Sequence, residues 1–369
     1  MKLGNGIFEF YMNFELARNR IPESRHNFAE IRRNNLIYVD KTSYIQKIAN
    51  SQAPVFISRP RRFGKSTIIS TLEELFKHGV KPYDGHDSYF KGLDIEKTWN
   101  EEHEYKVMKI DFSYDFAIAN NPKLFEEKFI QKIIDFAKEF NIELKDSNKD
   151  FNDYLKNFCE SAQERSLVLL IDEYDYHLSQ NIENPQLFSD YAAVLRIFYS
   201  VLKNQLSKFR CIFITGITRY KDSSIFTAGN TIADKSQRVE FGAITGYTKE
   251  EIKTYFKDNL IDAVATRNSI KHEDVTSKDI DALLEEMAYW YDGYCFDSSY
   301  KTHVFSTWSV IQFFLDAEFK FKKYWLTSGG NPTILQKSME KVVKNSENLV
   351  NHPPLKATLL KRGLHSLVD

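Results

Sequence analysis

The sequence predicts an α/β protein in which helices cover both faces of a parallel β-sheet and a smaller helical domain follows. Between residues 36 and 242, short apolar runs alternate with segments of helical periodicity, which is typical of βαβ units. One run, Leu167 to Ile171, consists of five aliphatic residues, as expected for a strand that is buried on both faces. Beyond residue 243 helical patterns dominate. These three observations define the fold class.

The composition is that of a soluble globular protein with more than one domain. The chain has 369 residues, of which 42% are apolar and 27% are charged. Its 50 basic and 51 acidic residues nearly cancel, so no overall charge drives it onto nucleic acid or a membrane. The three cysteines, Cys159, Cys211 and Cys295, have neither metal-ligand nor disulfide-framework spacing. Because we find no signal peptide and no run of 18 apolar residues, we expect a cytoplasmic protein.

The first strand and helix of the predicted sheet flank a short basic loop. The run "PVFIS" (54–58), followed by Pro60, predicts a buried strand. Residues 65–79 have apolar side chains at helical spacing, and Gly79 supplies a stop. The later predicted elements are strands at 105–113, around 167–172 and at 209–217, and helices at 122–140 and 185–205.

The helical domain begins after the last of these strands. Thr248 and Glu251 form a T-x-x-E capping box, which predicts a helix start. Further helical patterns cover 277–294 and 306–319. We divide the chain into four parts: an N-terminal extension (1–35), an α/β core (36–242), a smaller helical domain (243–330) and a C-terminal tail (331–369). The tail is rich in lysine, and a solvated helical face is favoured over a contact with nucleic acid.

The stretch "VFISRPRRFGKST" (55–67) predicts a phosphate-binding loop. Such a loop follows a buried strand and opens a helix, so that backbone N–H groups and the helix N-terminus face the phosphates. In the formula G-x-x-x-x-G-K-[ST], the lysine reaches the β- and γ-phosphates and the Ser/Thr hydroxyl ligates Mg²⁺. Arg59 stands where the formula has its first glycine, and the alternative interpretation is a basic turn. The predicted nucleotide-binding residues are Arg61, Arg62, Phe63, Gly64, Lys65, Ser66 and Thr67.

Not all residues of this loop are expected to face the nucleotide. We expect one of Arg61 and Arg62 to neutralise phosphate charge, and the other interpretation pairs them with surface acids. For Phe63 we favour packing onto the core over stacking on a base.

A second element, "LVLLIDEYD", supplies acids at the end of a buried strand. Asp172 would hold Mg²⁺ and Glu173 would polarise the attacking water as a general base. Asp175 is a weaker candidate for the same work. In "CIFITGITRY", Arg219 could direct a cation at the γ-phosphate, whereas the simpler interpretation is ordinary turn polarity.

These motifs, in this order, resemble the AAA-ATPase-like family of bacterial P-loop NTPases. The matching stretches are "YVDKTSYI" (38–45), "SRPRRFGKST" (58–67), "FKGLDI" (90–95), "VMKIDFS" (107–113), "LLIDEYD" (169–175), "IFITGITRY" (212–220), "GYTKEEI" (246–252), "WYDGYCF" (290–296) and "STWSVIQFF…YWLTSGG" (306–330). The resemblance covers about residues 25–330 and implies a P-loop NTPase core with a lid. It also implies that Lys65 and Ser66 bind phosphate and Mg²⁺, and that Asp172 and Glu173 are the acidic pair.

The resemblance and the motifs together predict an Mg²⁺-dependent ATPase that uses ATP hydrolysis to switch the position of its lid. The alternative is a nucleotide-gated binding module that hydrolyses little ATP and recruits nucleic acid or a nuclease partner. Members of the family are often fused to a nuclease domain of the PD-(D/E)xK type, and we expect that domain to be absent here because 39 residues after position 330 are too few. A homo-oligomer is compatible with the sequence, and an arginine finger could come from Arg219 or from a neighbouring subunit.

Overall fold

The main sheet is parallel throughout. The computed structural model describes residues 17–145, 150–220 and 231–324. Five strands lie in the order β2-β3-β4-β1-β5, and each neighbouring pair is parallel. The strands are β1 (Val55–Ser58), β2 (Lys106–Asp111), β3 (Leu167–Asp172), β4 (Phe209–Gly216) and β5 (Ala233–Asp234). The predicted α/β fold with a parallel sheet is confirmed.

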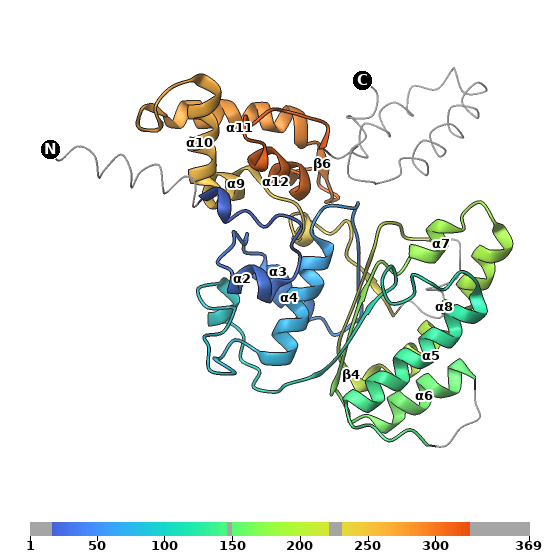
Figure 1. Ribbon diagram of the computed structural model, residues 1–369. Helices are drawn as coiled ribbons and strands as arrows, with labels where there is room; N and C mark the ends of the chain where they lie inside the picture. The colour runs from blue at the N-terminus through green and yellow to red at the C-terminus, as the bar shows by residue number, and fades with distance from the viewer. Residues whose placement is uncertain (1–16, 146–149, 221–230, 325–369) are drawn as a thin grey trace.

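Helices cover both faces of this sheet (Figure 1). One layer contains α2 (Phe28–Arg33), α3 (Thr42–Ala49) and α4 (Lys65–His78). The other contains α5 (Pro122–Glu139), α6 (Phe151–Ser161), α7 (Tyr176–Gln180) and α8 (Pro185–Asn204). Short 3₁₀ helices lie at Asp94–Lys97, Leu206–Lys208, Val239–Phe241 and His272–Asp274.

The alternation of side chains along the strands explains why the sheet needs two layers. On β3, Leu169 and Ile171 belong to the apolar cluster beneath α5–α8, whereas Val168 and Leu170 belong to the cluster beneath α2–α4. β1 divides in the same way, because Phe56 faces the first cluster while Val55 and Ile57 face the second. Since successive strand residues point to opposite faces, an all-apolar strand is buried only when both faces are covered.

A group of C-terminal helices lies beyond the end of the sheet where α4 begins (Figure 1). Its elements are α9 (Lys249–Tyr255), α10 (Lys257–Asn268), α11 (Ser277–Tyr291), α12 (Thr307–Leu315) and an antiparallel hairpin of β6 (Tyr294–Cys295) and β7 (His303–Val304). The predicted capping box of Thr248 and Glu251 begins α9. Ile21, Ile37 and Val39, which precede β1, share an apolar cluster with these helices. The segment that contains these three residues therefore packs in one apolar core with the C-terminal helices.

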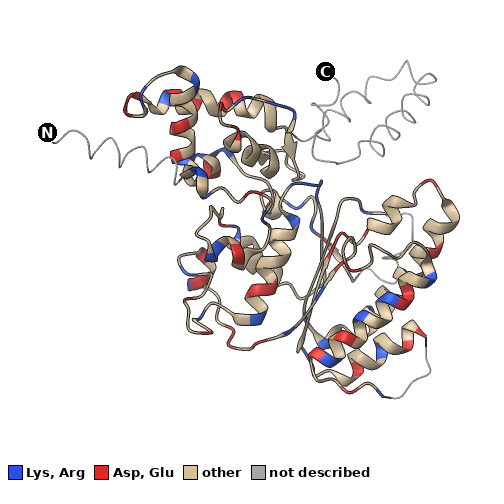
Figure 2. Ribbon diagram, viewed as in Figure 1, with Lys and Arg blue, Asp and Glu red and all other residues tan. Residues whose placement is uncertain are grey.

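Acidic and basic residues are both spread along the helices and loops (Figure 2). Among the residues that the structure describes, no helix combines the length and the apolar character that crossing a membrane requires. The predicted C-terminal tail, residues 331–369, lies outside the described residues.

Candidate functional site

The predicted phosphate loop connects β1 to α4 at the carboxyl ends of the parallel strands. Gly64 caps the N-terminus of α4 with a φ of 89°, a left-handed conformation that a residue without Cβ adopts at little cost. Arg62 is also left-handed, with a φ of 69°, and such a value in a non-glycine residue is a feature of strained functional loops. Lys65 and Ser66 then open a helix of 14 residues, whose first N–H groups have no partner within the helix.

Lys65 is turned back onto the loop that precedes it. Its ammonium donates hydrogen bonds to the carbonyl oxygens of Arg59 (3.1 Å) and Pro60 (3.0 Å). The side chain is buried, and burial lowers the pKa of Lys65 while the charge of Asp172 opposes that shift. An ammonium has three N–H donors, so two carbonyls leave capacity for a phosphate oxygen.

Ser66 and Asp172 are brought into direct contact. The Ser66 hydroxyl donates a 2.6 Å hydrogen bond to Oδ2 of Asp172, which is buried at the end of β3. Burial raises the pKa of Asp172 to about 6, although the Ser66 hydrogen bond and the Lys65 charge lower it. Asp111 is the register partner of Asp172 on β2, and its charge raises that pKa further. Hydroxyl and carboxylate oxygens side by side are the ligand types that Mg²⁺ prefers.

Glu173 follows in an unusual backbone conformation. Its φ of 47° is left-handed, and its N–H donates to Oδ1 of Asp172 over 3.0 Å. The next N–H, of Tyr174, donates to the Thr215 carbonyl over 3.2 Å. The acids thus occupy a turn that is tied to β3 on one side and to β4 on the other.

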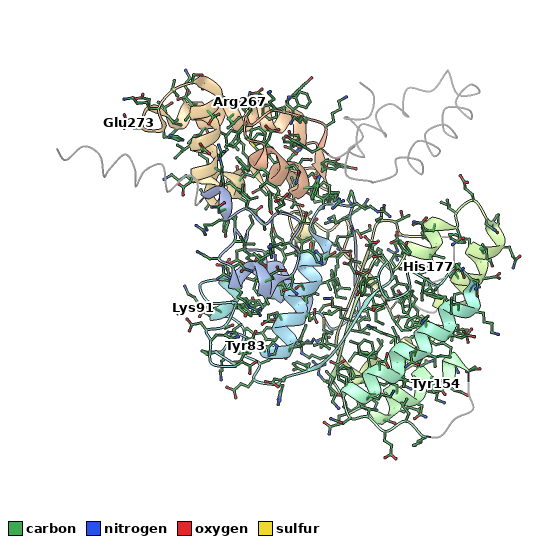
Figure 3. The ribbon with its side chains drawn as sticks, viewed as in Figure 1. Tyr83, Lys91, Tyr154, His177, Arg267 and Glu273 are labelled. Carbon is green, nitrogen blue, oxygen red and sulfur yellow. The ribbon has the colours of Figure 1, made fainter. Side chains whose placement is uncertain are left out.

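Asp175 and His177, which follow the acidic pair along the chain, contact other parts of the α/β core. Asp175 is buried and accepts hydrogen bonds from backbone N–H groups at the end of β4. His177, labelled in Figure 3, is also buried and contacts the Phe116 carbonyl through Nε2 at 3.1 Å. Burial lowers the pKa of His177. Its surroundings are the aromatic rings of Phe125 and Tyr191.

Arg219 forms an ion pair with Asp234 on the edge strand β5. Its guanidinium also lies 5.9 Å from the centre of the Phe56 ring, which belongs to β1. The predicted role of Arg219 at the γ-phosphate requires that this ion pair opens.

The three arginines around the loop have different surroundings. Arg59 is buried, and its guanidinium donates hydrogen bonds to the carbonyls of Ser58, Ser236 and Phe241. These bonds connect the start of the phosphate loop to the segment that follows β5. Arg61 is half-buried and has no hydrogen bond or ion pair among the described residues. It lies near enough to Lys65 that its charge lowers the pKa of that lysine.

The tip of the loop contacts the C-terminal helices directly. The Arg62 carbonyl accepts hydrogen bonds from Thr307 Oγ1 (2.6 Å) and from the Trp308 N–H (3.3 Å), at the start of α12. The Arg62 guanidinium lies 4.4 Å from the Trp308 ring centre. Phe63 is buried against Tyr294 and Phe296 around the β6–β7 hairpin, with ring centres 4.7 and 5.3 Å away. Phe63 therefore packs, as favoured from the sequence, but against the helical part.

A cavity of about 180 Å³ opens beside Gly64 and Thr67. Its walls come from three distant segments: residues 22–41, residues 244–247 and the first residues of α12. The lining is largely apolar, with Tyr38, Lys41 and Thr245 among its polar members. Sequence reasoning missed this cavity because its walls are separated by more than two hundred residues.

The fold and the loop geometry define an α/β protein with a P-loop-like core. The chain belongs to the family described as "Predicted AAA-ATPase", whose model matches residues 22–226, more than half of the 369 residues. The chain is also similar to an uncharacterized protein in the vnfD 5′ region of Azotobacter chroococcum mcd 1, with 26% identity over 323 residues. That match covers 87% of this chain and 56% of the relative, so the chain spans little more than half of the relative's length. No solved structure matches the chain.

Proposed function

We propose that the protein binds ATP with Mg²⁺ at the β1–α4 loop and hydrolyses it, and that the nucleotide state moves α9–α12 as a lid. The observation that carries this proposal is the 2.6 Å hydrogen bond between Ser66 and Asp172. It joins the helix start after a basic loop to a buried acid on another strand, and a P-loop NTPase holds Mg²⁺ with such a hydroxyl and such an acid.

The phosphates would bind at the start of α4. There the unpaired N–H groups and the positive end of the helix dipole favour anions. Lys65 would exchange its bonds to the Arg59 and Pro60 carbonyls for phosphate oxygens. Arg61 is a second cation beside Lys65, and unlike Arg59 it has no side-chain hydrogen bond among the described residues.

Ser66 and Asp172 would hold the magnesium ion. The ion supplies charge neutralisation for the β- and γ-phosphates when it is bound. The residues fit it, because a buried carboxylate with a raised pKa, about 6, is a site where a divalent cation relieves the cost of burying charge. At neutral pH the Asp172 carboxylate is ionised and ready to coordinate.

Glu173 would act on the attacking water. Its left-handed backbone, with a φ of 47°, directs the residue after Asp172 away from the regular course of the strand. A carboxylate held next to the phosphate site accepts a proton from water in the transition state, or orients the water, without any covalent intermediate. The work of the site is then positioning and charge stabilisation.

The cavity beside Gly64 and Thr67 would receive the base and ribose. A nucleotide whose phosphates bind at the start of α4 extends naturally into the space next to Thr67. Because the cavity walls include Trp308 and residues 244–247, a bound nucleotide would touch both the core and the C-terminal helices. The Arg62 carbonyl also bonds to the start of α12. A nucleotide bound at the loop would therefore change the position of α12 through contacts on both sides of the cavity.

The test is a comparison of ATP binding by calorimetry in the presence of Mg²⁺. The natural protein should bind, and Lys65→Ala should bind at least about tenfold more weakly, since a charge-assisted contact is lost. Lys81→Ala is the matched control, because Lys81 is exposed and pairs with Glu102 beyond the far end of α4. Equal affinity of the natural protein and Lys65→Ala would refute the site. ATP binding without phosphate release would instead support the nucleotide-gated binding module.

A further inference from the structure

Asp175 is a buried carboxylate whose hydrogen bonds, among the described residues, go to the chain after β4 and not to the phosphate loop or Ser66. Its charge nevertheless acts on Lys65 of the loop, whose pKa it raises. Asp175 is 1% exposed. Its Oδ1 and Oδ2 each lie 3.1 Å from the Ile217 nitrogen, and Oδ2 accepts a second hydrogen bond, of 2.7 Å, from the Thr218 N–H. A carboxylate that accepts adjacent backbone N–H groups fixes the course of that backbone.

Tyr174 also forms hydrogen bonds to the residues that follow Ile217. Its hydroxyl donates to the Thr218 carbonyl over 2.7 Å and accepts from the Tyr220 N–H over 3.3 Å. Its ring stands edge-on to Phe56, with ring centres 5.4 Å apart. We call residues 215–220, which leave the end of β4, the β4 exit.

Gly216 shows how closely the acid turn is packed onto the β4 exit. A Cβ added at Gly216 would lie 2.5 Å from Oδ1 of Asp175 and 2.6 Å from Cδ1 of Tyr174. The Gly216 carbonyl in turn accepts a 3.0 Å hydrogen bond from the Arg59 N–H, at the entrance of the phosphate loop. The β4 exit is therefore held between the acid turn and the loop, and any shift in it changes the distance between them.

We propose that Asp175 is a positioning residue for ATP hydrolysis, which acts through the β4 exit to hold Glu173 and Arg219 in register with the phosphate loop. This role rests on the proposed function and assigns Asp175 a task different from that of Glu173. It gives a role to a third acid of the turn, whose carboxylate bonds to the Ile217 and Thr218 N–H groups.

Asp175→Asn tests the role with little change in the shape of the side chain. A carboxamide oxygen at the Oδ2 position can still accept from the Thr218 and Ile217 N–H groups. The NH₂ group then replaces Oδ1, faces the Ile217 N–H and cannot accept. We expect the β4 exit to shift by a fraction of an ångström. Misplacement of catalytic groups on this scale lowers turnover by about tenfold to a hundredfold.

The experiment measures kcat and KM for Mg²⁺-ATP, the melting temperature and amide hydrogen exchange. Asp175→Asn should lower kcat by about tenfold or more with KM within about twofold. Exchange of the Ile217 and Thr218 amides should become faster. Tyr174→Phe, which removes the hydroxyl bonds to the β4 exit, should lower kcat in the same direction. The matched control is Asp316→Asn. It makes the same chemical change in a carboxylate that accepts a backbone N–H, from Glu318, in the turn after α12.

A merely structural role predicts that both asparagine variants lower the melting temperature and leave kcat unchanged. Equal kcat values for the natural protein and Asp175→Asn, or unchanged exchange at Ile217 and Thr218, would overturn the positioning role alone. Absence of turnover in the natural protein would overturn the proposed function and this role with it.

Discussion

The hydroxyl of Ser66 and the carboxylate of Asp172 lie 2.6 Å apart, although 106 residues separate them in the sequence. The contact depends on the strand order, because β4 stands between β1 and β3 and the carboxyl ends of all three strands point the same way. In a parallel sheet, a loop that follows one strand and an acid at the end of another strand can meet only where the carboxyl ends of the strands lie side by side. The site is thus a product of the parallel topology.

Arg219 and Asp234 form an ion pair that we expect to restrain hydrolysis. If Arg219 serves the γ-phosphate, Asp234→Asn should release it and raise kcat, whereas Arg219→Ala should lower kcat with ATP affinity within about threefold. Steady-state phosphate release on both variants checks this. Equal effects of the two substitutions would show that the pair is structural and that Arg219 is not a catalytic residue.

Trp308 should matter for both the loop and the cavity. Trp308→Ala removes the aromatic face under the Arg62 guanidinium, worth about 0.5–1 kcal/mol at an exposed site, and opens one wall of the cavity. We expect weaker ATP binding and faster amide exchange at the start of α12. Trp308→Phe keeps an aromatic face and should retain most of the affinity. Unchanged ATP binding by Trp308→Ala would contradict the placement of the base in the cavity.

An ion pair between Lys41 and Glu251 connects the segment before β1 to α9. The Lys41 side chain is buried and that of Glu251 is partly buried. The Lys41 ammonium contacts both carboxylate oxygens of Glu251, at 2.6 and 2.7 Å, and donates to the Ala243 carbonyl at 2.7 Å. Burial lowers the pKa of Lys41, and Glu251 opposes that shift. Glu251→Gln leaves the lysine charge unpaired and should cost about 3–5 kcal/mol of unfolding free energy.

The double variant Lys41→Met, Glu251→Leu provides the control for that pair. It removes both charges but also the Glu251 oxygen that accepts from the Thr248 N–H in the capping box of α9. Apart from that loss, typically about 1 kcal/mol, its stability in urea unfolding should lie closer to that of the natural protein than the stability of Glu251→Gln does. Additive losses in the double variant would argue that the two side chains do not depend on each other.

Glu73 should make the stability of the protein depend on pH. Its carboxylate accepts from Lys77 (2.9 Å) and Lys109 (2.7 Å), and these contacts hold the pKa of Glu73 below its ordinary value despite its burial. A depressed pKa contributes stability that is present above the unfolded-state pKa of about 4.3 and is lost as the pH falls through the folded-state value. Glu73→Gln should therefore be less stable than the natural protein at pH 7, and the difference should shrink as the pH falls below the unfolded-state pKa. A difference that does not change over this pH range would contradict the assignment.

Four strands of the main sheet were predictable as apolar runs, and most helices as periodic apolar patterns, whereas β5 (Ala233–Asp234) is too short to carry either signal. The predicted helix at 65–79 is Lys65–His78 in the structure, and the predicted strand at 209–217 is Phe209–Gly216. The sequence analysis missed α6 (Phe151–Ser161), although Phe151, Leu155 and Phe158 carry a helical spacing that could have revealed it. The β6–β7 hairpin has strands of two residues, which are too short to show a period.

The roles of individual arginines and acids could not be read from the sequence. Arg59, Arg61 and Arg62 are almost adjacent, yet the first is buried under carbonyls and the last stacks on a tryptophan about 246 positions away. Asp172 and Asp175 both follow the same strand, but the first meets Ser66 and the second meets the β4 exit. These differences arise from tertiary contacts, which local patterns do not encode.

The most direct test of the account is release of phosphate from ATP by the natural protein and by Glu173→Gln, with and without Mg²⁺. We predict Mg²⁺-dependent release by the natural protein, and ATP binding without release by Glu173→Gln, because the glutamine keeps the shape of the side chain and cannot take a proton from water. Equal phosphate release by the two proteins, or release by the natural protein that needs no Mg²⁺, would contradict the central claim.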